Sequence, residues 1–275
     1  MLSRMTNDTA PLSPHRPLPP LSATVTGSGP GIVLAHGATG SIDDNFARLL
    51  PALADSGHTV VAPDYPGSGR TPRASGPLTL DALTDAVVDG AVAAGLETFT
   101  LIGYSLGTAV AVRAATRYPR RVSGLVLTAG LAAPDRRTDL WLALWQRLLE
   151  QDDYTGLALA RTLSGWAPGH LDGLPAVDVE TLLDPCPELV PSGSADQAAL
   201  VRTLDTRADL PHVAAPTLVI ATLHDQLVDP AHSRYLADRI PGARYAGLAA
   251  GHVPMHECPE EWERLIADFL AEHGL

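Results

Sequence analysis

Short apolar runs alternate with amphipathic stretches along the first half of the chain, and the alternation returns near its end. The runs lie at residues 32–35, 60–63, 99–102, 121–128, 216–221 and 244–248, the last being the weakest. They are rich in Val, Ile and Leu, which is typical of strands buried inside a parallel sheet. Because helical stretches separate them, the pattern predicts an α/β fold with right-handed crossovers.

Apolar residues at helical spacing mark the stretches between these strands. Stripes at i, i+3, i+4 and i+7 begin at Phe46, and comparable stripes begin at Leu80 and Trp262. We expect Pro51 to kink the first of these helices and Pro259 to begin the last. The stripe that contains Trp262 is interpreted as core packing.

The alternation of strands and helices breaks between residues 132 and 210. Helical segments around residues 140–145, 154–164 and 195–206 flank a Gly/Pro-rich stretch at residues 167–191. We interpret this region as a helical cap inserted between two core strands. Three of the four tryptophans, Trp141, Trp145 and Trp166, lie in it, and they either pack the cap onto the core or line an apolar pocket.

The segment Gly103-Tyr104-Ser105-Leu106-Gly107 follows the run at 99–102 and precedes an Ala/Val-rich helix. The pattern G-x-S-x-G alone is weak, because a Gly-rich loop with an idle serine looks the same. Between a strand and a helix, however, it predicts a tight turn that exposes a serine hydroxyl beside the amides of a helix N-terminus. Ser105 is therefore the candidate nucleophile.

A serine nucleophile requires a base and an acid that orients the base. Asp225 and His252 each follow a predicted strand, in the chain order Ser, Asp, His. We expect Asp229 to cap the next helix, and Asp135 is the alternative acid. The other histidines have no motif context, apart from His36 in a loop where a structural role is usual.

These segments resemble the α/β-hydrolase fold over roughly residues 22–270. The loop His36–Gly40 resembles the family's HG-x loop, and that match implies oxyanion-hole amides at Ala38 and Leu106. The segment that begins at Asp64 resembles the family's D-x-x-G-x-G turn, where we expect Asp64 to be structural.

The resemblance also implies a division of the chain. Residues 1–21 are expected to form a flexible Pro-rich arm, residues 22–131 and 211–275 the α/β-hydrolase core, and residues 132–210 the helical cap. Residues 23–26 are all that we expect of the family's early β-hairpin. The residues expected to line the substrate pocket are His36, Gly37, Tyr104, Trp141, Trp145, Trp166 and Val253, with Met255 and His256 as further candidates.

Composition narrows the classes of function. The 275 residues carry a formal net charge of −12, which argues against partners such as nucleic acid or an anionic membrane. All 19 basic residues are arginine, which excludes a Schiff-base lysine, pyridoxal phosphate and a Walker A lysine. No His/Asp spacing indicates a metal, and we expect no cofactor.

The compartment is inferred from cysteines and leader signals. Cys186 and Cys258 lie far apart and lack metal spacing, and residues 1–20 contain no apolar core of a signal peptide. We expect free thiols and a cytoplasmic protein without a membrane span. A homodimer is compatible with the sequence.

The expected function is that of a serine hydrolase. It would cleave a small to medium, largely apolar carboxylic ester, thioester or lactone through an acyl-enzyme on Ser105. The same residues would serve a non-hydrolytic or C–C bond-cleaving tailoring enzyme of secondary metabolism. A ligand-binding homologue without turnover is the third alternative, although such a protein normally shows a damaged triad.

Overall fold

The computed structural model describes residues 18–275, so most of the arm expected over residues 1–21 lies outside the described residues. Within that range one sheet contains β1 (Ala23–Gly27), β2 (Gly31–Ala35), β3 (Thr59–Pro63), β4 (Phe99–Tyr104), β5 (Val122–Thr128), β6 (Thr217–Thr222) and β7 (Arg244–Leu248). The strand order is β1-β3-β2-β4-β5-β6-β7. All neighbours pair in parallel except β1 and β3. The predicted α/β fold with a mostly parallel sheet is confirmed.

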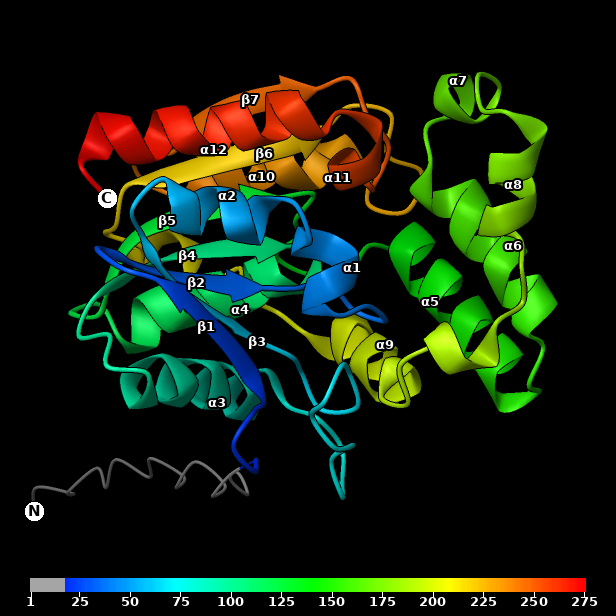
Figure 1. Cartoon of the computed structure of the whole chain (residues 1–275), viewed down its shortest axis with the longest axis horizontal. Coiled ribbons are helices and arrows are strands. Elements are labelled where there is room, and N and C mark those ends of the chain that lie inside the picture. The colour runs from blue at the N-terminus through cyan, green and yellow to red at the C-terminus, as the bar shows by residue number, and fades with distance from the viewer. Residues whose placement is uncertain (1–17) are drawn as a thin grey trace, which may run out of the picture.

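Helices flank the sheet on both faces (Figure 1). The helices of the core are α1 (Ile42–Phe46), α2 (Leu49–Asp55), α3 (Leu80–Ala93), α4 (Leu106–Arg117), α10 (Pro230–Arg239), α11 (Pro254–Glu257) and α12 (Pro259–His273). No helix among the described residues is long and apolar enough to cross a membrane.

The central strands send alternate side chains into two separate hydrophobic cores. Val33 and Leu101 face the core that α3 and α4 cover, whereas Ile32 and Ile102 face the core that α12 covers. Because both faces are buried, the strands carry apolar residues at successive positions. Trp262 is 1% exposed in the second core, as expected, and its indole N–H donates to Thr128 Oγ1 at 2.9 Å.

The helix expected from the Phe46 stripe is in fact two short helices. The chain leaves α1 after Phe46 and enters α2 at Leu49, so the break precedes Pro51 instead of being a kink at it. Pro51 lies in the first turn of α2, where its missing N–H removes no intrahelical hydrogen bond. The proline is therefore accommodated in the first turn of α2 and does not bend the helix.

Residues 132–210 carry a separate group of helices. They are α5 (Arg136–Glu150), α6 (Tyr154–Gly165), α7 (Pro168–Leu171), α8 (Ala176–Leu182) and α9 (Ser194–Thr203), with 3₁₀ turns at Pro187–Leu189 and Leu210–His212. Helices α5 to α8 lie together to one side of the sheet (Figure 1). The Gly/Pro-rich stretch at 167–191 thus contains short helices of its own.

The turn between β4 and α4 packs against the end of β2 with no room for side chains. A Cβ atom on Gly107 would collide with the carbonyl oxygen of Ala35, and one on Gly103 would collide with the carbonyl oxygen of Gly107. Neither glycine has a positive φ. Both are therefore required by close approach and not by their own backbone conformation.

Replacing Gly107 with alanine should lower the free energy of unfolding by about 1–3 kcal/mol, because the added methyl group overpacks the β2–α4 contact. Gly90→Ala in α3 is the matched control, since a Cβ there meets nothing within 4 Å. It should raise the free energy of unfolding by about 0.5–1 kcal/mol. Urea denaturation measures both, and equal changes in the two variants would contradict the close-approach explanation.

Candidate active site

Ser105 occupies a strained backbone position between β4 and α4. Its φ is 52° and its ψ is −117°, a region that non-glycine residues rarely adopt. The turn is held by hydrogen bonds from the Ser105 amide to Thr128 O at 3.0 Å and from Thr108 Oγ1 to Ser105 O at 2.7 Å. The hydroxyl consequently stands at the N-terminal end of α4.

The structure brings the three predicted residues into one hydrogen-bonded chain. His252 Nε2 lies 3.0 Å from Ser105 Oγ, and His252 Nδ1 lies 2.7 Å from Asp225 Oδ2. Asp225 is 3% exposed and His252 is 5% exposed. A carboxylate only accepts hydrogen bonds, so Nδ1 carries a proton and Nε2 is left to accept the Ser105 proton.

Further hydrogen bonds fix the orientation of the Asp225 carboxylate. Oδ1 accepts from the amides of Leu227 at 2.9 Å and Val228 at 2.8 Å. Oδ2 accepts from Thr222 Oγ1 at 2.9 Å besides facing His252. The acid is therefore held by the loop after β6 before the imidazole approaches it.

The competing carboxylates are engaged elsewhere. Asp229 caps α10 by accepting from the Ala231 amide at 2.8 Å, as predicted. Asp135 caps α5, and its Oδ2 lies 3.3 Å from His232 Nε2 instead of facing His252. Asp64 accepts from the Ile42 amide at 2.9 Å, which agrees with its expected structural role.

Two backbone amides beside Ser105 lack partners. Among residues 18–275 the amides of Ala38 and Leu106 donate no intramolecular hydrogen bond. Their neighbours do: the Gly37 amide donates to Asn45 Oδ1 at 2.9 Å, and the Thr39 amide donates to Gln197 Oε1 at 2.8 Å. The two free N–H groups are available to an oxygen of a ligand.

His36 supports this loop from beneath. Its Nε2 accepts from the Tyr65 amide at 2.9 Å, so Nδ1 carries the proton and donates to Gly37 O at 2.7 Å. The ring stacks on Tyr65 with centroids 3.8 Å apart. Complete burial lowers the pKa of His36 to about 4. The imidazole is therefore neutral near pH 7.

A cavity of about 370 Å³ opens at Ser105. We call it the catalytic cavity; its lining includes Ala38, Tyr104, Ser105, Leu131, Thr138, Leu142, Trp145, Arg161, Val201, Leu227, Val228, His252, Val253, Met255 and His256. Of the expected pocket residues, Tyr104, Trp145, Val253, Met255 and His256 are therefore on its wall.

Four expected pocket residues are not on this wall. His36 lies beneath the loop that presents Ala38, and Gly37 packs against the ring of Tyr104. Trp141 packs with Leu140 and Leu144 at the outer surface of α5. Trp166 stacks on His256 with ring centroids 5.8 Å apart and lines a neighbouring cavity. For Trp141 and Trp166, the packing of the helices of residues 132–210 decides which way the side chain points, and their contact with a substrate stays a prediction, as does that of His36 and Gly37.

Sequence reasoning also missed Arg161, which lies on the wall of the catalytic cavity. A signal was present: Arg161 is the single charged residue of α6. A lone charge in an otherwise uncharged helix beside a predicted site is a candidate for ligand contact.

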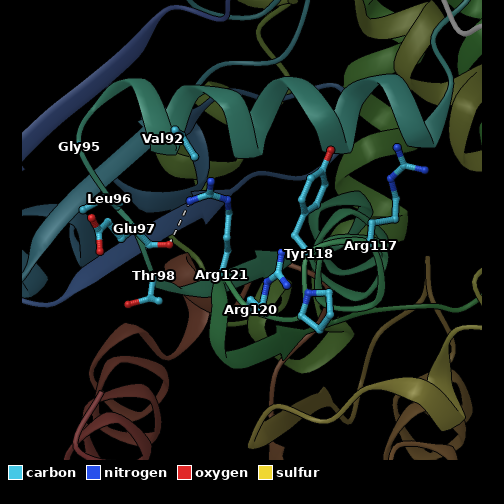
Figure 2. Close-up of a pocket in the computed structure, with 10 residues that line it drawn as sticks. Val92, Gly95, Leu96, Glu97, Thr98, Arg117, Tyr118, Arg120 and Arg121 are labelled. Atoms are coloured by element: carbon cyan, nitrogen blue, oxygen red, sulfur yellow. Dashed lines mark hydrogen bonds between the residues drawn. The ribbon is translucent and has the colours of Figure 1, made fainter.

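A larger depression lies at the opposite edge of the sheet (Figure 2). It has a volume of about 890 Å³ and is formed by the segments that precede β4 and β5. Arg121 bridges these segments by donating to Glu97 O at 3.2 Å. Ligands of open parallel sheets bind beyond the carboxyl ends of the strands, so the smaller cavity at Ser105 is the candidate active site.

The segment after α6 is tied to the His252 loop. The His252 amide donates to Gly165 O at 2.6 Å. Glu257 accepts from the Ala167 amide through Oε1 and from the Gly251 amide through Oε2, each at 3.0 Å. Tyr104 adds a hydrogen bond from its hydroxyl to His252 O at 2.8 Å. These contacts fix the position of the histidine relative to the helices of residues 132–210.

A second tie joins α9 to the loop of Ala38. Gln197 is fully buried, and its Oε1 accepts the Thr39 amide as described. Its Nε2 donates to Ser68 Oγ at 2.9 Å and to Pro66 O at 3.2 Å. Every polar atom of this side chain is therefore engaged, as a buried amide requires.

The two cysteines form no disulfide with each other. Cys186 and Cys258 are both free thiols, as expected. Across residues 18–275 no group of three or more His, Cys, Asp or Glu side chains could hold a metal ion.

Comparison with known proteins identifies the family. The family model of the alpha/beta hydrolase fold matches residues 30–259. Because this match spans most of the chain, the protein belongs to the α/β-hydrolase fold family.

Individual relatives have hydrolytic names. The chain is 35% identical over 257 residues to pyrrolizixenacetamide deacetylase of Xenorhabdus hominickii, covering 91% of this chain and 94% of that protein. It is 32% identical over 263 residues to a pimeloyl-(acyl-carrier protein) methyl ester esterase of Stenotrophomonas maltophilia, covering 90% and 95%. The crystal structure of the enol-lactonase from Burkholderia xenovorans LB400 matches with a TM-score of 0.81 at 25% identity, covering 91% and 96%. The chain is an α/β-hydrolase enzyme of the esterase type.

The buried neutral His36 should make stability depend on pH. The unfolded histidine has a pKa near 6.5 and the folded one about 4, so the unfolded state binds the proton first as the pH falls. The contribution is complete above pH 6.5 and is lost through pH 4. Between pH 7 and 4, the free energy of unfolding should fall by about 3 kcal/mol more in the wild type than in His36→Gln. Chemical denaturation across this range tests it; parallel pH curves would contradict it.

Glu257→Gln should weaken the tie to the His252 loop, because an amide NH₂ replaces one of two accepting oxygens and faces a backbone N–H. We expect the free energy of unfolding to fall by about 1–3 kcal/mol and ester hydrolysis to slow. Glu261→Gln is the control, since Glu261 is exposed one turn along. Thermal denaturation and initial rates measure both, and identical behaviour of the two variants would refute the positioning role.

Proposed function

We propose that this protein is a serine hydrolase in which Ser105 attacks a carbonyl carbon, His252 is the base and Asp225 orients it. The observation that carries the proposal is the unbroken chain Asp225–His252–Ser105, with distances of 2.7 and 3.0 Å, beside two unpartnered amides. Neither the hydrogen-bonded chain nor the pair of free amides contributes to packing of the hydrophobic core, so both are better explained by a catalytic role.

Acylation follows from these positions. As Ser105 Oγ bonds to the carbonyl carbon, its proton moves to His252 Nε2, and the carbonyl oxygen becomes an oxyanion. The amides of Ala38 and Leu106 are the proposed donors to that oxyanion, each contributing roughly 3 kcal/mol to the stabilisation of the transition state. Collapse of the intermediate expels the leaving group, which takes the proton from His252.

Deacylation repeats the sequence with water as the nucleophile. His252 takes a proton from water, the hydroxide oxygen bonds to the acyl carbon, and the resulting oxyanion is held by the same amides. Collapse breaks the bond to Ser105 Oγ, which recovers its proton from His252, and the acid product leaves. Asp225 stabilises the imidazolium in both halves and does not itself take the proton.

The substrate class follows from the cavity. About 370 Å³ suits a small to medium substrate, and the side chains of Leu131, Leu142, Trp145 and Val201 make much of its wall apolar. The relatives are named as a deacetylase, a methyl ester esterase and an enol-lactonase. We therefore propose carboxylic esters, lactones or activated amides, with residues 132–210 acting as the cap that shapes the acyl site.

Labelling by a fluorophosphonate probe tests the mechanism. Intact-protein mass should show a single adduct on the wild type and on the control Ser75→Ala, whose serine is exposed. Ser105→Ala should show none. His252→Ala should hydrolyse 4-nitrophenyl acetate about 10⁴- to 10⁶-fold more slowly.

Each outcome bears on a different part of the mechanism. An adduct that persists in Ser105→Ala would refute the nucleophile, and full activity of a folded His252→Ala would refute the base. A folded wild type that neither labels nor hydrolyses any ester would refute the proposed function as a whole.

A further inference from the structure

Arg161 lies where two cavities meet. It is on the wall of the catalytic cavity and also on the wall of a second cavity of about 310 Å³, which we call the cap cavity. Tyr154, Trp166 and Cys186 line the cap cavity away from Ser105. Arg161 is therefore half-buried, at the wall that the two cavities share.

The guanidinium has no direct partner among the described residues. No hydrogen bond or ion pair within 4 Å involves it, and the charge of Asp44 favours its protonated form only at longer range. Asp44 lies at the exposed rim, where its Oδ2 accepts from Ser41 Oγ at 2.8 Å. By contrast, Arg113 and Arg202 at other helix contacts each pair with an aspartate.

A guanidinium that is partly removed from water and has no anionic partner is energetically unfavourable. Burial lowers the pKa of Arg161, but a guanidinium remains protonated at neutral pH. Buried charges are ordinarily paired, since removal from water is costly. A ligand that supplies the missing anion would compensate this cost.

Other polar groups in the catalytic cavity also donate. The amides of Ala38 and Leu106 are free, as described above. Arg161 and these two amides are donors, while the carboxylates of Asp43 and Asp44 are exposed at the rim. A ligand rich in acceptors fits this arrangement.

We propose that Arg161 binds a free carboxylate of the substrate, so that the preferred substrates are esters or amides that carry a second, ionised carboxyl group a short chain away from the scissile carbonyl. This inference rests on the proposed function of Ser105. The planar fork of the guanidinium matches both carboxylate oxygens, and the anchored end would place the scissile carbonyl at Ser105.

The test compares each acidic substrate with its methyl-capped neutral counterpart. Mono-4-nitrophenyl esters of succinate, glutarate and adipate place the carboxylate on the acyl side, and 4-acetoxybutyrate places it on the alcohol side. In the wild type, kcat/KM for the best acidic substrate should exceed that of its capped counterpart by tenfold or more.

Arg161→Gln should reduce this ratio to one or below, because Asp43 and Asp44 then repel the carboxylate. Its kcat/KM should fall at least tenfold more for the acidic substrates than for the capped esters, which lack the carboxylate that Arg161 would bind. Arg161→Lys keeps the charge without the fork and should give an intermediate ratio. Arg147→Gln is the matched control: it removes one charge from an exposed position on α5 and should leave the ratio unchanged.

Failure of this inference is distinguishable from failure of the proposed function. If capped esters are hydrolysed but no acidic substrate is preferred, or if Arg161→Gln lowers both classes equally, the carboxylate site is refuted and Ser105 chemistry stands. If no ester is hydrolysed, calorimetric titration with 4-phenylbutyrate tests whether Arg161 binds a carboxylate. Binding lost in Arg161→Gln and kept in Arg147→Gln supports the site, and no Arg161-dependent binding refutes it.

Discussion

The close contact between the β4–α4 turn and the end of β2 is the constraint on which the site depends. Strand and helix meet with only glycine at Gly103 and Gly107, and a single extra carbon at either position would separate them. Ser105 adopts its positive-φ conformation inside this turn, and the chain from Ala35 to Ala38 passes directly beside it. The positions of the reactive hydroxyl and of both free amides thus depend on the same close contact between the β4–α4 turn and the end of β2.

Polar side chains connect the helices of residues 132–210 to the catalytic loops, in addition to the apolar cluster that Leu142, Trp145 and Val201 share with the core. Gln197 takes the amide of Thr39, and Glu257 takes the amides of Gly251 and Ala167. A hydrogen bond has directional geometry, whereas apolar contact tolerates sliding. Ties of this kind hold the neighbouring loops in register, which explains why buried or half-buried polar groups are retained here.

The sheet and the three hydrogen-bonded residues were predictable because each strand, and each of the three residues, is marked by a pattern in the sequence immediately around it. Buried strands are recognisable from their Val-, Ile- and Leu-rich composition. Ser105, Asp225 and His252 each lie within a few residues of the end of such a strand. The lining of the catalytic cavity was not predictable to the same extent. Trp141 and Trp145 are one helical turn apart, yet only Trp145 faces the cavity, since the packing of α5 against its neighbours decides which side is covered. Intrinsic helix propensities do not determine which side of α5 faces the cavity.

The hydrogen bond from the His252 amide to Gly165 O has a kinetic consequence. Lifting the segment of residues 165–167 from the core would break this bond together with both bonds of Glu257. Opening the cavity at this segment would therefore also release the loop that carries His252. At that point of the wall, an open cavity and an aligned base exclude one another, so the chemical step requires this segment to be seated on the core.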